Sequence, residues 1–365
     1  MMRNIYFYLP KSSSIATSFQ DLLSRWQTYA EQLAKLTGSK SNIVMLTDSD
    51  ESQDIFNGLQ PLFVGKSRLR QLIWLYDRFI RDQSEKMMIA GNNFDALFIA
   101  LFVRRFSKNT RIQASIHMEV EAIKRLVGFK GFIKKILLKS MIPKVDSIRV
   151  VRNSEREKVA KYFDVNPDRI VVCPLPIALE LLIDTQELER HTNRMGVIGF
   201  VGRIHKERKP LYWAEITSLL LEKFRSVNLL IVGEGPLREQ MHRKLSQYSD
   251  RVDFMGQLLV NELVSVWKEI HTLLITAPFE SYGMAAREAL LNGCFVVAPN
   301  IDAYKDLKNL APKAVHLYDN KVEAIQLMET VLKRTQTIEE TQQLRAKILF
   351  DQEEKLQNLA KSWVF

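Results

Sequence analysis

Hydrophobic residues along this chain fall into short runs of strand length, separated by longer stretches in which they recur at helical spacing. In the first half the runs lie at 5–9, 43–46, 86–90, 112–116, 147–151 and 170–173. In the second half they lie at 197–201, 228–232, 252–255, 272–276 and 294–298. Helical patterns such as 19–37 separate them, and the tail over 335–361 is also helical. Strands that alternate with helices are typical of parallel sheets.

The two series of runs predict two domains. Pro174-Leu175-Pro176 and the polar stretch 187–195 lie between them. We therefore expect an α/β protein with two Rossmann-like, doubly wound domains facing each other across a cleft, with ligands at the carboxyl ends of the strands. The predicted boundaries are an amino-terminal domain over 1–176, a carboxy-terminal domain over 177–350, and a terminal helix over 351–365 that packs back on the amino-terminal domain.

The composition is that of a globular protein and excludes several other classes. With 365 residues, 46% of them hydrophobic, the chain is long enough for two cores and too rich in aromatic residues for disorder. Cys173 and Cys294 lie too far apart for a disulfide framework or a cysteine-based zinc site. No apolar run approaches the roughly 18 residues of a membrane-spanning helix. We expect a cytoplasmic protein.

The excess positive charge lies in the first half of the chain. The formal net charge is +10; residues 1–180 contain 28 Lys and Arg against 18 Asp and Glu, and the rest contains 24 of each. Residues 121–141 predict a basic amphipathic helix, interrupted near Gly128 and Gly131. Such a helix can lie on an anionic membrane. The cations that would contact the membrane or an acceptor are Lys124, Arg125, Lys130, Lys134, Lys135 and Lys139.

Alternatively, this segment is an ordinary helix of the domain that contacts neither a membrane nor an acceptor. Its apolar residues, among them Ile133 and Ile136, would then form a stripe on the core, and its lysines would be solvated. A nucleic-acid partner is not expected, because no zinc-finger, homeodomain or RNP-like motif accompanies the charge.

The first strand of the second half is followed by a cationic loop. Gly202 and Arg203 end the strand, and Lys206, Arg208 and Lys209 follow within six residues. Such a loop suits a diphosphate, although a solvated basic turn would have the same composition.

Glycines mark the next two strand ends. Gly233-Glu234-Gly235 follows the run at 228–232 and permits a tight turn. Gly256 follows the run at 252–255, where an exposed backbone edge can read a planar base. Each of these signals is weak by itself.

The fourth strand end carries two carboxylates. Glu280 lies in the loop after 272–276, and Glu288 lies eight positions further on, in a predicted helix. The amides around Gly283 and Met284 would open that helix and point at an anion. One carboxylate can then reach a sugar hydroxyl and the other a ribose, with a phosphate between them.

Together these motifs resemble the family-4 retaining glycosyltransferases of the GT-B fold, whose carboxy-terminal domain carries an E-x7-E motif. The motif here is Glu280 to Glu288, and the likeness covers most of 195–310. Over 1–175 it extends only to the order of elements. The resemblance implies a nucleotide-sugar donor, most simply a UDP-sugar, a retaining front-face mechanism, and no metal or other cofactor.

The resemblance also implies roles for individual residues. Arg203 and Lys209 would bind the donor diphosphate and stabilise the leaving group. Arg208 is a substitute for Lys209, because the family lysine normally falls five residues after the arginine. Glu280 would hold hydroxyls of the transferred sugar. Glu288 would bind the ribose, and His117, which follows the strand at 112–116, would lie near the sugar. The other residues that would contact the donor are Gly202, Gly256, Gly283 and Met284.

The chain departs from the family pattern in two further loops. The loop after the first strand, 10–14, contains no glycine, whereas the family commonly places a glycine-rich loop there. After Pro299 the family usually has one or two glycines before an acidic residue, and this chain has Asn300-Ile301-Asp302. These departures bear on the acceptor and on donor specificity.

The function predicted is transfer of a sugar from a nucleotide-sugar to a glycan or lipid-linked acceptor in cell-envelope polysaccharide or glycoconjugate synthesis. The protein would act at the inner face of the plasma membrane. Two alternatives are a glycosyltransferase-like partner protein without activity and a sugar-nucleotide epimerase of the same architecture.

Overall fold

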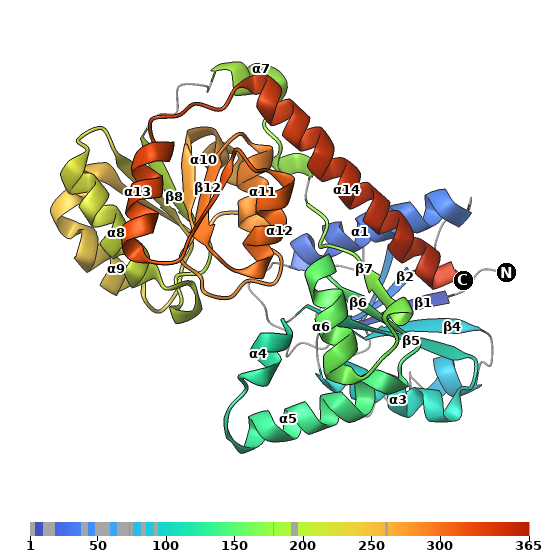
Figure 1. The fold of residues 1–365 in the computed structure, drawn as a ribbon. Helices are drawn as coiled ribbons and strands as arrows, with labels where there is room; N and C mark the ends of the chain where they lie inside the picture. The colour runs from blue at the N-terminus through green and yellow to red at the C-terminus, as the bar shows by residue number, and fades with distance from the viewer. Residues whose placement is uncertain are drawn as a thin grey trace. The chain divides into compact units, whose positions relative to one another are not determined.

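The computed structural model divides the chain into two compact units, each built around one parallel sheet (Figure 1). The amino-terminal unit comprises 1–176 and 352–365, and the carboxy-terminal unit comprises 177–351. The predicted pair of parallel sheets is confirmed. The structure describes residues 4–9, 19–37, 43–47, 59–63, 73, 76–81, 85–90, 94–117, 119–177, 179–190, 196–259 and 262–364.

The sheet of the amino-terminal unit has the strand order β3-β2-β1-β4-β5-β6-β7, with every pair parallel. Its strands are β1 Asn4–Leu9, β2 Ile43–Thr47, β3 Leu59–Phe63, β4 Lys86–Ala90, β5 Thr110–Ile116, β6 Ser147–Val150 and β7 Ile170–Val172. Its helices are α1 Phe19–Thr37, α3 Phe94–Phe106, α4 Val120–Lys124, α5 Gly128–Met141 and α6 Asn153–Phe163, with short turns at Tyr76–Arg81, Ile142–Lys144 and Pro167–Arg169.

The sheet of the carboxy-terminal unit has the order β10-β9-β8-β11-β12-β13, also parallel. Its strands are β8 Val197–Val201, β9 Asn228–Val232, β10 Val252–Gly256, β11 Thr272–Leu274, β12 Phe295–Pro299 and β13 Val315–Tyr318. Its helices are α7 Thr185–Arg190, α8 Pro210–Lys223, α9 Arg238–Leu245, α10 Leu263–Glu269, α11 Met284–Leu291, α12 Asp302–Leu310, α13 Lys321–Val331 and the long α14 Ile338–Val364, with short turns at Leu179–Leu181, Lys206–Arg208 and Ser246–Arg251. In Figure 1, α8, α9 and α13 cover one face of this sheet and α11 and α12 the other.

Two strands at sheet edges were not predicted from the sequence. β3 contains Pro61, which cannot donate a backbone hydrogen bond and is tolerated because β3 pairs only with β2. β13 is only four residues long and includes the polar His316, so it lacks an apolar run. Both strands form because the neighbouring strand provides backbone hydrogen-bond partners. The local sequence pattern does not show which strands will be neighbours.

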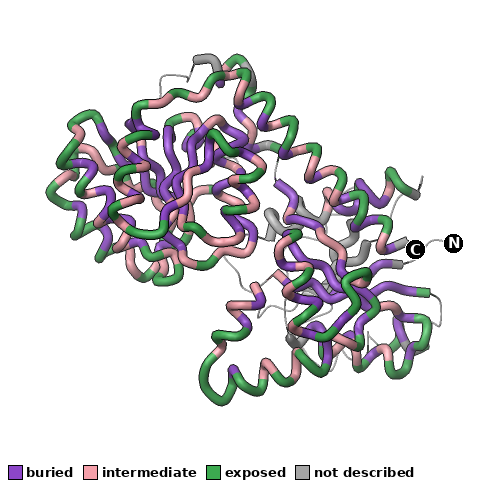
Figure 2. Tube along the Cα trace, viewed as in Figure 1, coloured by how far each residue is buried: buried purple, intermediate pink, exposed green. Residues whose placement is uncertain are grey.

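Each unit has its own buried core (Figure 2). In the carboxy-terminal unit, Trp213 and Trp267 are fully buried, and the Trp213 indole donates a 3.0 Å hydrogen bond to the carbonyl of Leu274 in β11. In the amino-terminal unit, one apolar cluster includes residues of α3 and α6, and another includes residues of α1.

The end of α14 completes the core of the amino-terminal unit. Trp363 is fully buried, its ring lies edge-on to Tyr29 at 6.1 Å, and its indole donates a 2.9 Å hydrogen bond to Gln113 of β5. At the same contact, the buried Gln32 of α1 donates to the Glu353 carboxylate at 2.8 and 3.0 Å. The first part of α14, up to residue 351, belongs to the carboxy-terminal unit.

Charged residues recur along α14, the longest helix in the described part of the chain. No helix within that part is both long enough and apolar enough to cross a membrane.

Replacing Trp363 by alanine is expected to destabilise the amino-terminal unit by about 3–5 kcal/mol, because it leaves a large cavity and removes the partner of Gln113. Urea unfolding would measure the loss. The matched control is Phe350→Ala on the same helix, where the ring is exposed and the change should stay within about 0.5 kcal/mol. Equal effects of the two variants would contradict the prediction.

Candidate functional site

The turn after β8 places two cations at the carboxyl end of the carboxy-terminal sheet. The Arg203 side chain is half exposed, and its only described ion pair is a 3.5 Å contact with the exposed Glu207. Lys209 ends the helical turn 206–208 and precedes α8. Its side chain is exposed and makes no ion pair with any described residue. Both side chains are therefore available to an anion.

The backbone of Lys209 is held in a conformation that a lysine seldom adopts. Its φ is +48°, in the left-handed region, where a side chain with a Cβ is strained. The buried hydroxyl of Thr276 donates to the carbonyls of Arg208 at 2.8 Å and Lys209 at 3.2 Å. Thr276 follows β11, so the end of one strand fixes the turn after its neighbour.

A second link between these loops is the ion pair of Arg208 with Glu280. One Glu280 carboxylate oxygen accepts from the Arg208 guanidinium, and the other accepts from the amide of Ser281 at 3.0 Å. Burial would lower the pKa of Arg208, but the charge and hydrogen bond of Glu280 outweigh burial, so its pKa is raised. Arg208 is thus committed to Glu280, which leaves Arg203, Lys206 and Lys209 as the open cations of this turn.

Glycines bring three strand ends into contact. A Cβ on Gly233, after β9, would lie 2.0 Å from the carbonyl oxygen of Gly202, so only glycine fits there. The amide of Gly233 donates a 2.7 Å hydrogen bond to the carbonyl of Gly256, which ends β10 with a φ of +70°. The turns after β8, β9 and β10 therefore form one surface, with Gly202 and Gly256 in it.

The start of α11 is open to an anion. Gly283 precedes the helix with a φ of +75°, and no described side chain caps the amides that follow, which begin with the half-buried Met284. A Cβ on Gly283 would approach the Tyr304 ring to 3.0 Å. Uncapped amides at a helix start carry partial positive charge and are a common phosphate site.

The two carboxylates of the E-x7-E motif occupy different settings. Glu280 lies in the loop between β11 and α11 and is mostly buried by its two partners. Glu288 lies on α11 with a half-buried side chain, and its carbonyl accepts from Asn292. Asn292 is itself buried and also binds Ile183 and Leu181, which fixes the end of α11.

In the amino-terminal unit, His117 directly follows β5 and is half buried. Its neighbour Ile116 pairs with Val150 of β6, so the segments after β5 and β6 leave the same edge of the sheet. His117 is therefore at the carboxyl edge of the sheet, where the sequence predicted a site.

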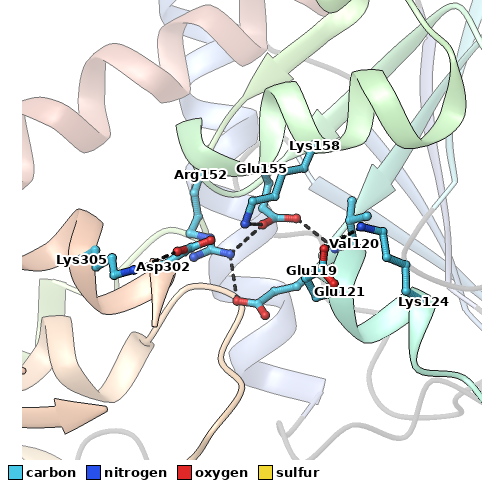
Figure 3. Close-up of polar contacts among 9 residues, drawn as sticks. All are labelled: Glu119, Val120, Glu121, Lys124, Arg152, Glu155, Lys158, Asp302 and Lys305. Atoms are coloured by element: carbon cyan, nitrogen blue, oxygen red, sulfur yellow. Dashed lines mark hydrogen bonds and ion pairs between the residues drawn. The ribbon is translucent and has the colours of Figure 1, made fainter. Parts of the chain in front are cut away.

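A buried charge cluster joins these two segments (Figure 3). Arg152, after β6, donates to Glu119 at 2.9 Å and to Glu155 of α6 at 3.0 Å. Glu155 also accepts from the amide of Val120 at 3.0 Å and from Lys158 at 3.3 Å. The start of α4, three residues after His117, is thus tied to the start of α6.

Sequence reasoning missed this cluster. A charged residue directly after the buried run at 147–151 was the available signal, because strand ends carry site residues in parallel sheets. Arg152 and Glu155 look like ordinary helix-start residues until β5 and β6 are known to be neighbours.

The cations of 121–141 do not share one environment. Lys124 pairs with Glu121 at 2.7 Å, and Lys135 donates to the Lys124 carbonyl at 3.2 Å. Lys139 lies 4.6 Å from the Tyr162 ring. Lys130 and Lys134 have no partner among the described residues, and Arg125 is exposed at the end of α4.

The predicted interruption of this helix is only partly correct. The break lies at 125–127, and Gly128 begins α5 with a φ of +75°. Gly131 lies inside α5 and is buried. A Cβ at this position would come within 2.9 Å of the Leu126 backbone. Gly131 therefore permits a close approach and does not end the helix.

Other sequence features have simpler outcomes. The loop 10–14 lies outside the described residues. After β12, Asp302 begins α12 and pairs with Lys305 at 3.7 Å (Figure 3). Cys173 and Cys294 are buried thiols. No group of three His, Cys, Asp or Glu within the described ranges could hold a metal ion.

Comparison with known proteins gives a family match in the carboxy-terminal unit. Residues 196–328 match the family model described as glycosyl transferases group 1. The chain is 31% identical over 151 residues to a 2-deoxystreptamine glucosyltransferase of Streptomyces kanamyceticus. That alignment covers 39% of this chain and 36% of the relative, so the chain matches about a third of the relative's length.

Solved structures resemble nearly the whole chain. HepE of Anabaena, in complex with UDP and glucose, has a TM-score of 0.63 and 13% identity over 99% of this chain and 95% of its own. WaaG, a glycosyltransferase involved in lipopolysaccharide biosynthesis, has a TM-score of 0.66 and 15% identity over 98% and 95%. At such identities the likeness concerns the fold, and it confirms the predicted GT-B architecture.

Gly233→Ala is expected to destabilise the carboxy-terminal unit by roughly 2 kcal/mol more than Gly202→Ala does, since forcing a group into a filled space costs about 1–3 kcal/mol. Both glycines have positive φ, so both variants also carry backbone strain of about 1–3 kcal/mol. Only at Gly233 does the new methyl group meet a carbonyl oxygen, whereas no described atom lies within 4 Å of a Cβ on Gly202. Urea unfolding measures both losses, and equal losses would show that the close contact is not what requires glycine.

Proposed function

Because residues 196–328 match the family model of the glycosyl transferases group 1, we propose that the chain transfers a sugar from a nucleotide-sugar donor to an acceptor. The observation that carries the proposal is the arrangement at the carboxyl ends of β8 and β11. There Arg203 and Lys209 are open cations, the start of α11 has no cap among the described side chains, and Glu280 is held beside them by Arg208.

The donor proposed is a UDP-sugar. HepE, which shares the fold, was solved with UDP and glucose. In this chain the turn 202–209 and the amides at Gly283 and Met284 would bind the diphosphate. Gly256 would present its backbone edge to the base, and Glu288 would bind the ribose.

The catalytic role proposed for this site is electrostatic. As the bond from the sugar to the phosphate breaks, negative charge grows on the leaving diphosphate, and Arg203 and Lys209 would stabilise it. The strained backbone of Lys209, held by Thr276, supports this role, because the turn that carries the side chain is formed before the donor binds. Each Glu280 oxygen has one protein partner and keeps a second lone-pair site for a sugar hydroxyl.

The stereochemistry proposed is retention, with attack from the face that the leaving group vacates. In that route the leaving phosphate helps to take the proton of the acceptor hydroxyl. It requires neither a protein nucleophile nor a metal ion. His117 would contact the sugar from the amino-terminal unit.

The acceptor proposed is a glycan or lipid-linked glycan of the cell envelope, reached at the inner face of the plasma membrane. WaaG, which shares the fold, is involved in lipopolysaccharide biosynthesis. Lys130 and Lys134 on α5, which pair with no described residue, support contact with an anionic membrane.

Donor binding is tested by thermal unfolding in saturating UDP, GDP or ADP. A ligand at about 100 times its dissociation constant adds roughly 2.7 kcal/mol, which corresponds to a rise in Tm of about 5–11 °C for a domain of this size. We expect the rise with UDP, and its loss in Arg203→Ala and in Glu288→Ala. Arg225→Ala, an exposed arginine in the same unit, should keep it. No rise with any nucleotide would contradict the proposal and favour a non-catalytic partner protein.

Catalysis is tested with Glu280→Gln, which keeps the shape of the side chain but removes its charge. Release of UDP from UDP-sugars should fall roughly 100-fold, a loss typical of a polar group that acts in the transition state. Glu339→Gln, an exposed carboxylate of α14, is the control and should release UDP at the wild-type rate. Unchanged release by Glu280→Gln would contradict the assignment, and conversion of a UDP-sugar to its epimer would favour the epimerase.

A further inference from the structure

Helix α5 presents its apolar side chains to solvent. Phe129, Phe132 and Ile136 are 78%, 58% and 51% exposed, and Ile133 is exposed as well. Their spacing of i, i+3, i+4 and i+7 places all four on one face of the helix. The alternative in which the apolar residues of this segment pack on the core is therefore wrong for Ile133 and Ile136, although it holds for Ile123 of α4, which is buried.

The opposite face of α5 is the one that packs on the unit. Gly131 is buried against Leu126, and Leu138 packs on the core. Lys135 lies on this side and donates to a backbone carbonyl of α4. The packed side of the helix thus carries Gly131, Leu138 and Lys135, and the face formed by the exposed phenylalanine and isoleucine side chains is left uncovered by the described residues.

Helix α3, which contacts α5, has a second exposed apolar stripe. Phe98, Phe102 and Phe106 lie at i, i+4 and i+8 and are each about half exposed, while Ala100 and Val103 are buried on the other side. The rings of Phe102 and Phe106 meet edge to face at 5.3 Å. Figure 2 shows exposed residues along α5 and at the end of α3.

These side chains lie on or next to two helices that contact each other, and we call them together the α3–α5 face. Of the 18 exposed large apolar residues in the described parts of the chain, eight lie between 98 and 136. Concentration on two contacting helices is unusual, because singly scattered apolar residues are the norm on soluble surfaces. The members are Phe98, Phe102, Phe106, Val127, Phe129, Phe132, Ile133 and Ile136.

The charge around the α3–α5 face is positive. Within the described ranges, Arg105, Lys108, Lys130 and Lys134 form no ion pair. The nearby carboxylates are neutralised, since Glu121 pairs with Lys124 and Asp146 with Arg104. An anionic partner with an apolar interior satisfies both properties of the face.

We propose that the α3–α5 face inserts into the boundary between headgroups and acyl chains of an anionic lipid bilayer. The phenylalanine and isoleucine side chains enter the acyl region, and the unpaired cations meet lipid phosphates. A second copy of the chain is a poorer occupant, because a symmetric contact would bring the same cations together. The inference rests on the proposed function and deepens it, because it specifies how the enzyme reaches a lipid-linked acceptor.

Sedimentation with anionic vesicles, made of phosphatidylglycerol with an excess of phosphatidylcholine, tests the inference. Phe132→Ser/Ile136→Ser and, separately, Phe98→Ser/Phe102→Ser should each weaken partitioning roughly tenfold or more, because they remove the buried apolar area. Leu219→Ser/Phe350→Ser, two exposed apolar residues elsewhere, is the control and should bind as wild type does. Wild-type binding by both test variants would overturn the proposal.

A separate variant tests whether the lysines of α5 contribute to binding of anionic lipid. Lys130→Gln/Lys134→Gln should weaken binding to the anionic vesicles by about fivefold per lysine and leave binding to pure phosphatidylcholine unchanged. Equal binding to both kinds of vesicle by the wild-type protein would contradict the role of these cations.

Insertion depth is measured with an environment-sensitive dye on Phe132→Cys. Cys173 and Cys294 are fully buried, so the new thiol is labelled selectively. With the anionic vesicles the emission should shift to the blue and be quenched by brominated acyl chains, and the same dye on Phe350→Cys should do neither. An unchanged, water-like emission at position 132 would exclude insertion.

Two further measurements separate the possible failures. A concentration-dependent dimer without lipid, lost in Phe132→Ser/Ile136→Ser, would assign the face to a second copy and overturn the proposal. The rise in Tm with UDP reports the carboxy-terminal unit alone. If the wild-type protein fails to bind the anionic vesicles but keeps its rise in Tm with UDP, only this inference is refuted. If it binds the vesicles but shows no rise in Tm with any nucleotide, only the proposed function is refuted.

Discussion

The candidate site depends on the ion pair between Arg208 and Glu280. This contact joins the loops after β8 and β11, and Thr276 reinforces it by holding the backbone of Arg208 and Lys209. Without the ion pair, the hydrogen bonds of Thr276 would be the remaining described side-chain link between the turn at Arg208 and Lys209 and the loop after β11. Preorganisation of this kind is worth more for catalysis than the number of charges, because no reorganisation is then needed during the reaction.

Much of this arrangement could be predicted from the sequence. Eleven strands, the two sheets, the resemblance to family-4 glycosyltransferases and the position of Glu280 after a strand follow from local patterns and from motif spacing. The pairing of Arg208 with Glu280 does not, since the two residues are 72 positions apart and β8 and β11 are neighbours only because the sheet reverses its order there. The cluster of Arg152, Glu119 and Glu155 was missed for the same reason.

Which face of an amphipathic helix packs on the domain is a second property that hydrophobic periodicity does not predict. The pattern of α5 correctly predicted a helix with an apolar face and a basic face, but it did not say which face packs on the unit. The attachment is decided by Gly131, which lets the Leu126 backbone approach, and by Leu138 and Lys135. A few packing contacts, among them the close approach that Gly131 permits, therefore determine that the phenylalanines point outward.

The course of α14 has a consequence for the order in which the chain folds during synthesis. The space that Trp363 occupies in the amino-terminal unit is filled by a residue that follows the whole carboxy-terminal unit along the chain. On the ribosome, the segment 1–176 therefore emerges with part of its core open. The carboxy-terminal unit can complete its own sheet before that core closes, so of the two units the one made earlier is the later to reach its final packing.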